Sequence, residues 1–217
     1  MIENSYELYQ LLEKQDLLQN KPPMWWPSYG SFEVIVGAIL TQNSQWTRVE
    51  VSLQNLRSDN ALDLQSLGDI ELERLQELIK PSGLFKSKAN YLKTLASSIV
   101  NSFGTFEEFC REVDREWLLA QKGIGPESAD SILCYACKKD FMVVDTYTGR
   151  LLNAFGYEFE SYTDLQEWCS KELILHFKKE ELPKVYALFH GMIVEFVKAN
   201  SKGKKVNIEV LKQGSTI

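Results

Sequence analysis

Apolar residues recur three and four positions apart along almost the whole chain, and this spacing limits the fold more than any other feature. It is clearest in three segments, which contain Leu72, Leu75, Leu78 and Ile79; Ala89, Leu92, Leu95, Ile99 and Phe103; and Val185, Leu188, Phe189, Met192 and Phe196. This period places apolar side chains on one face of an α-helix, whereas a half-buried strand alternates apolar and polar residues. The sequence contains no convincing strand alternation. The pattern therefore predicts an all-α protein.

Several helix boundaries are also marked in the sequence. Three patterns stand out: Thr105 with Glu108, Thr163 with Gln166, and Gly125 followed by Pro126. The first two match the capping box, and the third matches a helix that begins with proline. The segment 32–40, FEVIVGAIL, is apolar on nearly all sides, which favours a helix in the centre of a domain, with a buried strand as the alternative.

Composition limits the class of protein. The 217 residues are 44% hydrophobic, which is enough for ordinary buried cores. No apolar run approaches the roughly 20 residues of a membrane helix, and the first residues, MIENSYELYQ, do not resemble an export signal. We therefore expect a cytoplasmic protein that binds no membrane and keeps its four cysteines reduced. The net charge of −6 does not favour nucleic-acid binding, so any such binding must come from local features.

The most informative turn lies in the segment 118–132, LLAQKGIGPESADSI. Its sequence predicts a helix, a turn with two glycines, Gly123 and Gly125, and a second helix from Pro126. The glycines allow unusual backbone angles and the close approach of another chain. The N–H groups at the start of the second helix can then bind an anion such as a DNA phosphate. Taken alone, a plain interhelical turn is the favoured alternative.

An apolar run that ends in an acidic residue follows, as FMVVDT over residues 141–146. An aspartate between such a run and a new helix, here over 146–155, is ordinarily an N-cap. That interpretation is sufficient for Asp145 when the residue is considered alone. The hairpin and the aspartate together are a more specific signal than either feature alone.

In this combination the chain closely resembles the helix-hairpin-helix glycosylases of DNA repair. Their signature is a hairpin L-x-G-[IV]-G-x-x-x-A, followed by an apolar run and V-D-T. The matching elements here are Gln121–Gly125, Ala129, Val144–Thr146 and Arg150, with Ile39–Asn43 and Ser82–Ala89 upstream. The resemblance covers about residues 28 to 155.

The resemblance implies two helical domains with a cleft that holds an extruded base. Residues 29–137 would form a six-helix domain containing the hairpin, and residues 1–28 with 138–217 a second helical domain. The partner would be double-stranded DNA containing a damaged base, contacted by Gln42, Asn43, Lys122, Gly123, Ile124, Gly125, Glu127 and Ser128. The backbone carbonyls of Leu119, Gln121 and Ile124 would hold an alkali cation, Na+ or K+.

One position of the hairpin bears on the type of reaction. Relatives that resemble endonuclease III carry a lysine two residues after the second glycine, where its amine forms a Schiff base with the sugar. This chain has Glu127 there, and a carboxylate cannot form the imine. An iron–sulfur cluster needs four C-terminal cysteines, whereas only Cys169 follows Asp145, so we expect no cluster. These features favour a monofunctional glycosylase that uses water and no catalytic cofactor.

Asp145 would be the catalytic carboxylate. It would stabilise positive charge on the sugar and orient or deprotonate the attacking water. No second catalytic carboxylate is evident, which suits a base that is already cationic, such as 3-methyladenine. The expected base pocket consists of Trp25, Trp26, Pro27, Trp46 and Lys198, whose aromatic faces would attract a cationic purine. The alternative for the tryptophans is a place in the core.

These features together resemble bacterial 3-methyladenine DNA glycosylases of the endonuclease III-like branch. Three alternatives remain open: an endonuclease III-like enzyme with lyase activity on oxidised pyrimidines, a non-catalytic helix-hairpin-helix DNA-binding module, and a helical protein-interaction scaffold. We expect a monomer, because no heptad seam is visible. His176 and His190 are expected to be ordinary helix-face residues.

Overall fold

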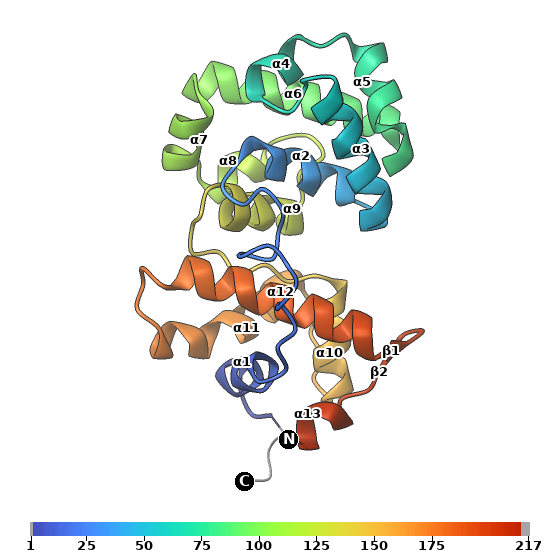
Figure 1. Ribbon diagram of the computed structural model, residues 1–217. Helices are drawn as coiled ribbons and strands as arrows, with labels where there is room; N and C mark the ends of the chain where they lie inside the picture. Colours follow the sequence, from blue (N-terminus) through green and yellow to red (C-terminus); the bar gives the residue numbers. More distant parts are fainter. Residues whose placement is uncertain (1, 214–217) are drawn as a thin grey trace. The chain divides into compact units, whose positions relative to one another are not determined.

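The computed structural model describes residues 2–213 and divides into two compact units (Figure 1). We call Ser28–Lys138 the central unit, and Met1–Pro27 with Lys139–Ile217 the terminal unit. The boundaries expected from the sequence differ from these by one residue. That the two parts are separate folding domains stays a prediction.

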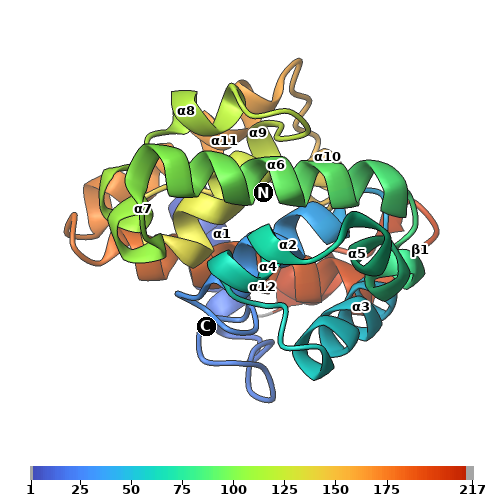
Figure 2. The ribbon, with the colours of Figure 1, turned by 90° about the horizontal axis from the view of Figure 1, so that it is seen from above.

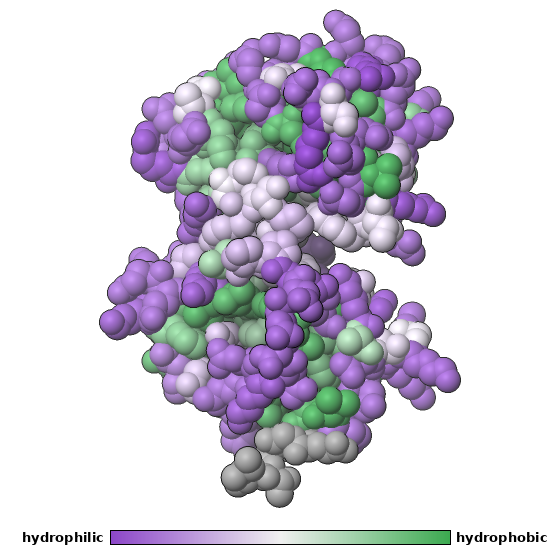
Figure 3. All heavy atoms as spheres, in the orientation of Figure 1, coloured by the Kyte–Doolittle hydropathy of each residue, from purple (hydrophilic) through white to green (hydrophobic). Residues whose placement is uncertain are grey.

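The prediction of an all-α protein is confirmed. Within residues 2–213, the strands are limited to β1 (Ser201–Lys202) and β2 (Lys205–Val206), which pair antiparallel with Ser201 opposite Val206. No helix in this range is long and apolar enough to cross a bilayer. Hydrophilic residues cover most of the face shown in Figure 3, with smaller hydrophobic groups between them.

The central unit is built around α2. Its helices are α2 (Phe32–Thr41), α3 (Trp46–Ser58), α4 (Leu64–Asp69), α5 (Leu72–Ile79), α6 (Phe85–Phe103), α7 (Phe106–Glu112), α8 (Arg115–Leu119) and α9 (Pro126–Ser131), with a 3₁₀ turn η1 (Lys80–Ser82) and a π-helical turn η2 (Ile132–Ala136). Helix α2 is buried on nearly all sides, as its apolar sequence predicts, and contacts α3, α6, α9 and η2. The long helix α6 runs across the unit and packs on α4, α5 and α7 (Figure 2).

The central unit therefore has eight α-helices, and the expectation of six was wrong. Three of the eight, α4, α7 and α8, have only six, seven and five residues. Each begins at a side-chain cap, Asp63, Thr105 or Asp114, which accepts a hydrogen bond from a backbone N–H three residues later. Such caps stabilise helices too short to show a full apolar period.

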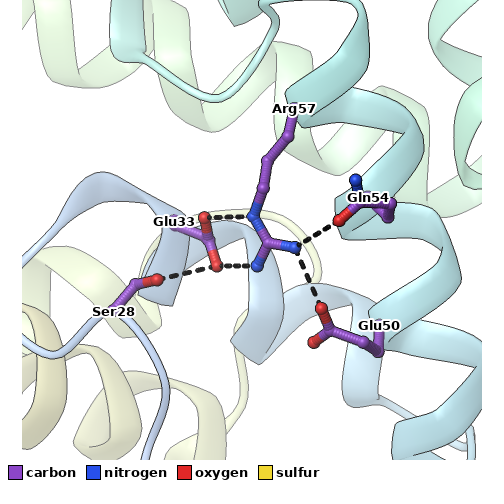
Figure 4. A network of polar contacts seen from close by, with 5 residues as sticks. All are labelled: Ser28, Glu33, Glu50, Gln54 and Arg57. Atoms are coloured by element: carbon purple, nitrogen blue, oxygen red, sulfur yellow. Dashed lines mark hydrogen bonds and ion pairs between the residues drawn. The ribbon is translucent and has the colours of Figure 1, made fainter.

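A polar network ties the start of α2 to the end of α3 (Figure 4). Arg57 Nε donates to Glu33 Oε2 at 3.1 Å, and Arg57 Nη1 donates to Glu50 Oε1 at 2.9 Å and to Gln54 Oε1 at 3.2 Å. Ser28 Oγ donates to the other oxygen of Glu33 at 2.9 Å. The network therefore holds the first residues of the central unit against α3.

The terminal unit is built from both ends of the chain. Its helices are α1 (Ser5–Glu13), α10 (Thr146–Ala154), α11 (Tyr162–His176), α12 (Leu182–Asn200) and α13 (Glu209–Gln213). Helix α12 contributes twelve buried residues and contacts α1, α10 and α11 (Figure 1).

Of the expected capping patterns, the Thr105 cap of α7 is confirmed and the Thr163 cap is wrong. Helix α11 begins earlier, with Ser161 as its N-cap, and Ser161 Oγ accepts from the N–H of Asp164 at 3.1 Å. A serine two positions upstream satisfies the same exposed N–H groups, so the sequence pattern alone was ambiguous by half a turn.

Candidate functional site

Asp145 lies where a buried extended segment turns into α10. Val143 and Val144 are fully buried, so the chain leaves the core directly at this aspartate. Asp145 is the N-cap of α10, and its Oδ1 accepts from Thr148 N at 2.9 Å and from Thr148 Oγ1 at 3.1 Å. The N-cap interpretation is thus confirmed. It fixes the carboxylate at the positive end of a helix dipole, which favours the ionised form.

The second carboxylate oxygen of Asp145 faces His190 on α12. Nε2 of the buried His190 lies 3.5 Å from Asp145 Oδ2. Burial raises the pKa of Asp145, but the hydrogen bond and charge of His190 and the hydrogen bonds from Thr148 prevail, and the pKa lies below its ordinary value of 3.8. The carboxylate is therefore ionised at neutral pH although only 14% of its side chain is exposed.

Trp25 lies against the same helix, α12. Its backbone has a φ of 65°, in the left-handed region that non-glycine residues rarely adopt. Its ring packs edge-on to His190, with centroids 5.1 Å apart, and lies directly over Gly191. A Cβ at position 191 would stand 2.5 Å from Trp25 Cγ, so only glycine permits this packing.

A cluster of charges surrounds the indole nitrogen of Trp25. Trp25 Nε1 donates to Glu195 Oε1 at 3.1 Å, and the other oxygen of Glu195 pairs with Lys21 Nζ at 2.6 Å. Lys198 Nζ lies 3.5 Å from Glu195 Oε1 and 5.9 Å from the centre of the Trp25 ring. Burial raises the pKa of Glu195, but hydrogen bonds from Lys21 and Trp25 and the charges of Lys198 and Lys21 prevail and lower it. Glu195 is thus a carboxylate between two lysines.

The expected pocket residues of the terminal unit are partly brought together. Lys198 lies between the rings of Trp25 and Tyr147, at 5.9 and 5.8 Å from their centres. Trp26 is buried and meets Trp25 edge-on at 6.0 Å, which makes it a support for Trp25. Pro27 follows in the same half-buried loop.

The hairpin joins α8 to α9 in the central unit. Gly123 has a φ of 86°, and a Cβ there would stand 2.4 Å from the ring of Tyr91. A Cβ at Gly125 would meet nothing within 4 Å, so its surroundings are open. The two glycines therefore differ: Gly123 is required by the fold, whereas the space beside Gly125 is open.

Gln42, directly after α2, is tied to the hairpin. Its Nε2 donates to the carbonyl of Gly123 at 2.8 Å and to Ser128 Oγ at 3.0 Å. Ser128 is buried, so its side chain positions Gln42. Asn43 is exposed with a φ of 52°, and Lys122 and Glu127 are also exposed.

The remaining expected residues lie in the central unit as well. Trp46 is half-buried at the first position of α3. Leu119 ends α8, and Gln121 and Ile124 form the turn, in which the N–H of Ile124 donates to the Gln121 carbonyl at 3.2 Å. Terminal helix carbonyls and turn carbonyls are neutral oxygen ligands of the kind that suits an alkali cation. Within residues 2–213 no cluster of His, Cys, Asp or Glu could hold a metal ion.

Sequence reasoning missed a buried lysine behind Gln42. Lys88 is 1% exposed, and its Nζ donates to the carbonyls of Leu40 at 2.7 Å and Ser82 at 2.8 Å. Burial lowers its pKa to about 8. Lys88 therefore links the last turn of α2, which Gln42 follows, to η1.

A bidentate ion pair across the hairpin was also missed. Asp130 on α9 is fully buried and accepts from Arg115 Nε at 2.7 Å and from Arg115 Nη2 at 3.1 Å. Arg115 is the first residue of α8. The pair therefore fixes the two hairpin helices to each other.

His190, Gly191 and Glu195 were likewise not identified as functional residues. One signal was present in the sequence: Gly191, Glu195 and Lys198 are spaced four and three residues apart, which places them on one face of a mostly apolar helix. A small residue and two charges on such a face indicate a packed ring and a polar site.

Comparisons with known proteins agree with this arrangement. The family model described as HhH-GPD superfamily base excision DNA repair protein matches residues 36–171. A Methanocaldococcus jannaschii protein, whose name places it with the DNA repair glycosylases, is 35% identical over 91% of this chain and 90% of its own. Endonuclease III of Sulfolobus acidocaldarius is 28% identical over 74% of this chain and 72% of its own.

A solved structure is closely similar. H. pylori 3-methyladenine DNA glycosylase, solved bound to 1,N6-ethenoadenine, is 42% identical with a TM-score of 0.87, covering 92% of this chain and all of that one. An endonuclease III–DNA complex shares the fold, with a TM-score of 0.73 at 19% identity. The helix-hairpin-helix, the buried aspartate after it and these matches together show that the chain belongs to the HhH-GPD superfamily of base excision DNA repair proteins and is a DNA N-glycosylase.

Proposed function

We propose that this glycosylase is monofunctional and removes alkylated purines, such as 3-methyladenine, from double-stranded DNA. The observation that carries the proposal is the terminal-unit cluster, in which an ionised, mostly buried Asp145 and the ring of Trp25 both contact His190. A negative charge beside an aromatic face suits a positively charged base and a sugar that becomes cationic as the base leaves. The similar H. pylori 3-methyladenine glycosylase supports this substrate class.

Asp145 acts mainly through its charge. Its lowered pKa makes it a weak base, so stabilisation of the oxocarbenium-like sugar is its larger contribution. Water attacks the sugar, and the carboxylate orients that water and accepts its proton at the end. An alkylated purine leaves without prior protonation, and this removes the need for a second acid.

The flipped base stacks on Trp25, which Trp26 supports and Lys198 borders, and Pro27 follows in the same loop. The expected gain from each ring contact with a cationic base is about 0.5–2 kcal/mol. Trp46 belongs to the central unit, and replacing it with leucine tests its contribution.

The hairpin binds the DNA backbone. The open surroundings of Gly125 and the exposed Lys122 suit phosphate contact, and Gln42 and Asn43 lie in the adjoining turn. The carbonyls of Leu119, Gln121 and Ile124 would hold Na+ or K+, which would supply positive charge near a phosphate. DNA affinity measured in KCl and in tetramethylammonium chloride at equal ionic strength tests this cation. A monomer acting in the cytoplasm completes the proposal.

Duplexes that each contain a single lesion test the proposed function. We expect release of 3-methyladenine without strand cleavage, and little release of oxidised pyrimidines. Release of oxidised pyrimidines with strand cleavage would assign the protein to endonuclease III-like chemistry. DNA binding without release of any base would leave only a binding module.

A further inference from the structure

Glu195 connects the ring of Trp25 to the charges beside it. Its Oε1 accepts the indole N–H of Trp25 at 3.1 Å, and its carboxylate pairs with Lys21 at 2.6 Å and lies 3.5 Å from Lys198. The Glu195 side chain is 16% exposed, whereas those of Lys21 and Lys198 are 38% and 42% exposed. Of the three charged groups, the carboxylate is therefore the least screened by solvent.

The hydrogen bond from Trp25 to Glu195 fixes the rotation of the indole ring. The backbone of Trp25 is in the left-handed region, which costs of order 1–3 kcal/mol for a non-glycine residue. The ring packs on Gly191 and makes an edge-on contact with His190. Its nitrogen is held by the hydrogen bond to Glu195. The ring is thus oriented in the free protein, before any base is bound.

The same carboxylate determines the charge beside the ring. Without Glu195, two ammonium groups would remain near Trp25, and Lys198 Nζ lies only 5.9 Å from the ring centre. Two positive charges would repel a cationic base, whereas a neutral base would feel no such repulsion. Glu195 offsets them.

On the basis of the proposed function, we propose that Glu195 is a positioning and specificity-determining residue. It orients Trp25 for stacking, and it offsets Lys21 and Lys198 so that the pocket prefers positively charged purines over neutral ones. Neither role requires Glu195 to touch the reacting atoms.

Glu195→Gln separates charge from orientation, because the amide oxygen can still accept the indole N–H. We measure kcat/KM for 3-methyladenine, which is cationic in DNA, and for 1,N6-ethenoadenine, which is neutral. The ratio of the two should fall about tenfold, the size expected for loss of one partly buried charge nearby. The matched control is Glu167→Gln, an exposed glutamate on α11, which should leave the ratio unchanged.

Glu195→Leu removes both the charge and the acceptor. We expect it to lower excision of both lesions and to change the near-ultraviolet circular dichroism of the indole bands. In a Trp25→Phe background, which has no indole N–H, the further change in ethenoadenine excision and in the spectrum should disappear.

Three outcomes would overturn the proposal. One is an unchanged lesion ratio in Glu195→Gln with wild-type melting temperature. Another is that Glu195→Gln lowers excision of both lesions by the same factor and also lowers the melting temperature, which indicates a structural role only. The third is a spectral change that persists in Trp25→Phe. If the wild-type protein releases neither lesion, the proposed function and the selectivity role fail together, and the spectra still decide whether Glu195 orients Trp25.

Discussion

The ring of Trp25 lies on Gly191 with no space for a side chain between them, since a Cβ at position 191 would be 2.5 Å from Trp25 Cγ. Trp25 is 166 residues before Gly191 in the chain. The contact places an aromatic residue of a loop on the helix that also carries His190, the partner of Asp145.

Gly191→Ala should therefore displace Trp25. Alanine favours helix by about 1 kcal/mol over glycine, so the variant should still fold. We expect kcat/KM for base release to fall about tenfold or more, because small misplacements of positioning groups have large kinetic effects. Gly68→Ala on α4 is the control, since a Cβ there meets nothing within 4 Å. Equal activities of the two variants would remove Trp25 from the site.

Asp145→Asn should abolish most catalysis and preserve the fold. Asparagine caps helices as well as aspartate does, so α10 should retain its N-cap. Loss of the negative charge should lower single-turnover base excision by at least about a hundredfold. Melting temperature and DNA affinity provide the controls. Near-wild-type turnover would show that Asp145 is not the catalytic carboxylate.

The depressed pKa of Asp145 predicts the acid side of the pH profile. Excision of a cationic base should persist as the pH falls to 3.8, the ordinary pKa of an aspartate. Excision should decline only when the pH falls further, through the lower pKa of Asp145. In the same way, ionised Asp145 stabilises the fold above about pH 3.8, and this contribution is lost as the pH falls through the depressed pKa.

His190→Gln should move this acid limb upward, because the variant removes the imidazole whose interactions lower the pKa of Asp145. The measurement is kcat/KM against pH for both proteins, with melting temperatures at each pH. Superimposable profiles would show that His190 has no electrostatic effect on Asp145.

The two hairpin glycines should respond differently to alanine. Gly123→Ala should destabilise the protein by about 1–3 kcal/mol, because of its positive φ and the ring of Tyr91. Gly125→Ala should leave the melting temperature nearly unchanged and weaken DNA binding, because its Cβ would enter the space we assign to the DNA backbone. Unaltered DNA affinity in Gly125→Ala would argue against backbone contact at this glycine.

Borohydride should trap no covalent adduct between the protein and lesion-containing DNA, because Glu127 provides no amine. An endonuclease III, trapped under the same conditions, is the positive control. A strong adduct band with this protein would show that a lysine elsewhere attacks the sugar.

Local sequence patterns predicted the helices better than their boundaries or number. The apolar segment 32–40 became the central helix α2, and Pro126 begins α9 as expected. The start of α11 was misplaced because Ser161 and Thr163 can both cap a helix, and only tertiary packing decides between them. The π-helical turn after α9 has no recognisable sequence signal.

The candidate site was predictable where the sequence resembles the helix-hairpin-helix glycosylases. That resemblance pointed to Asp145, the hairpin glycines, Trp25 and Lys198. His190 and Glu195 lie 45 and 50 residues beyond Asp145, and nothing local relates them to it. Their roles depend on the packing of α12 against α10 and against the loop that carries Trp25.

The terminal unit is discontinuous, and this has a consequence for synthesis on the ribosome. The central unit is one uninterrupted segment, and the prediction of separate folding domains implies that it begins to fold once residue 138 has emerged. The bond from Trp25 to Glu195 closes a loop of 170 residues and has to wait for α12. During translation the hairpin is therefore complete before the cluster around Asp145 and Trp25, so the proposed DNA contacts should form before the proposed catalytic site.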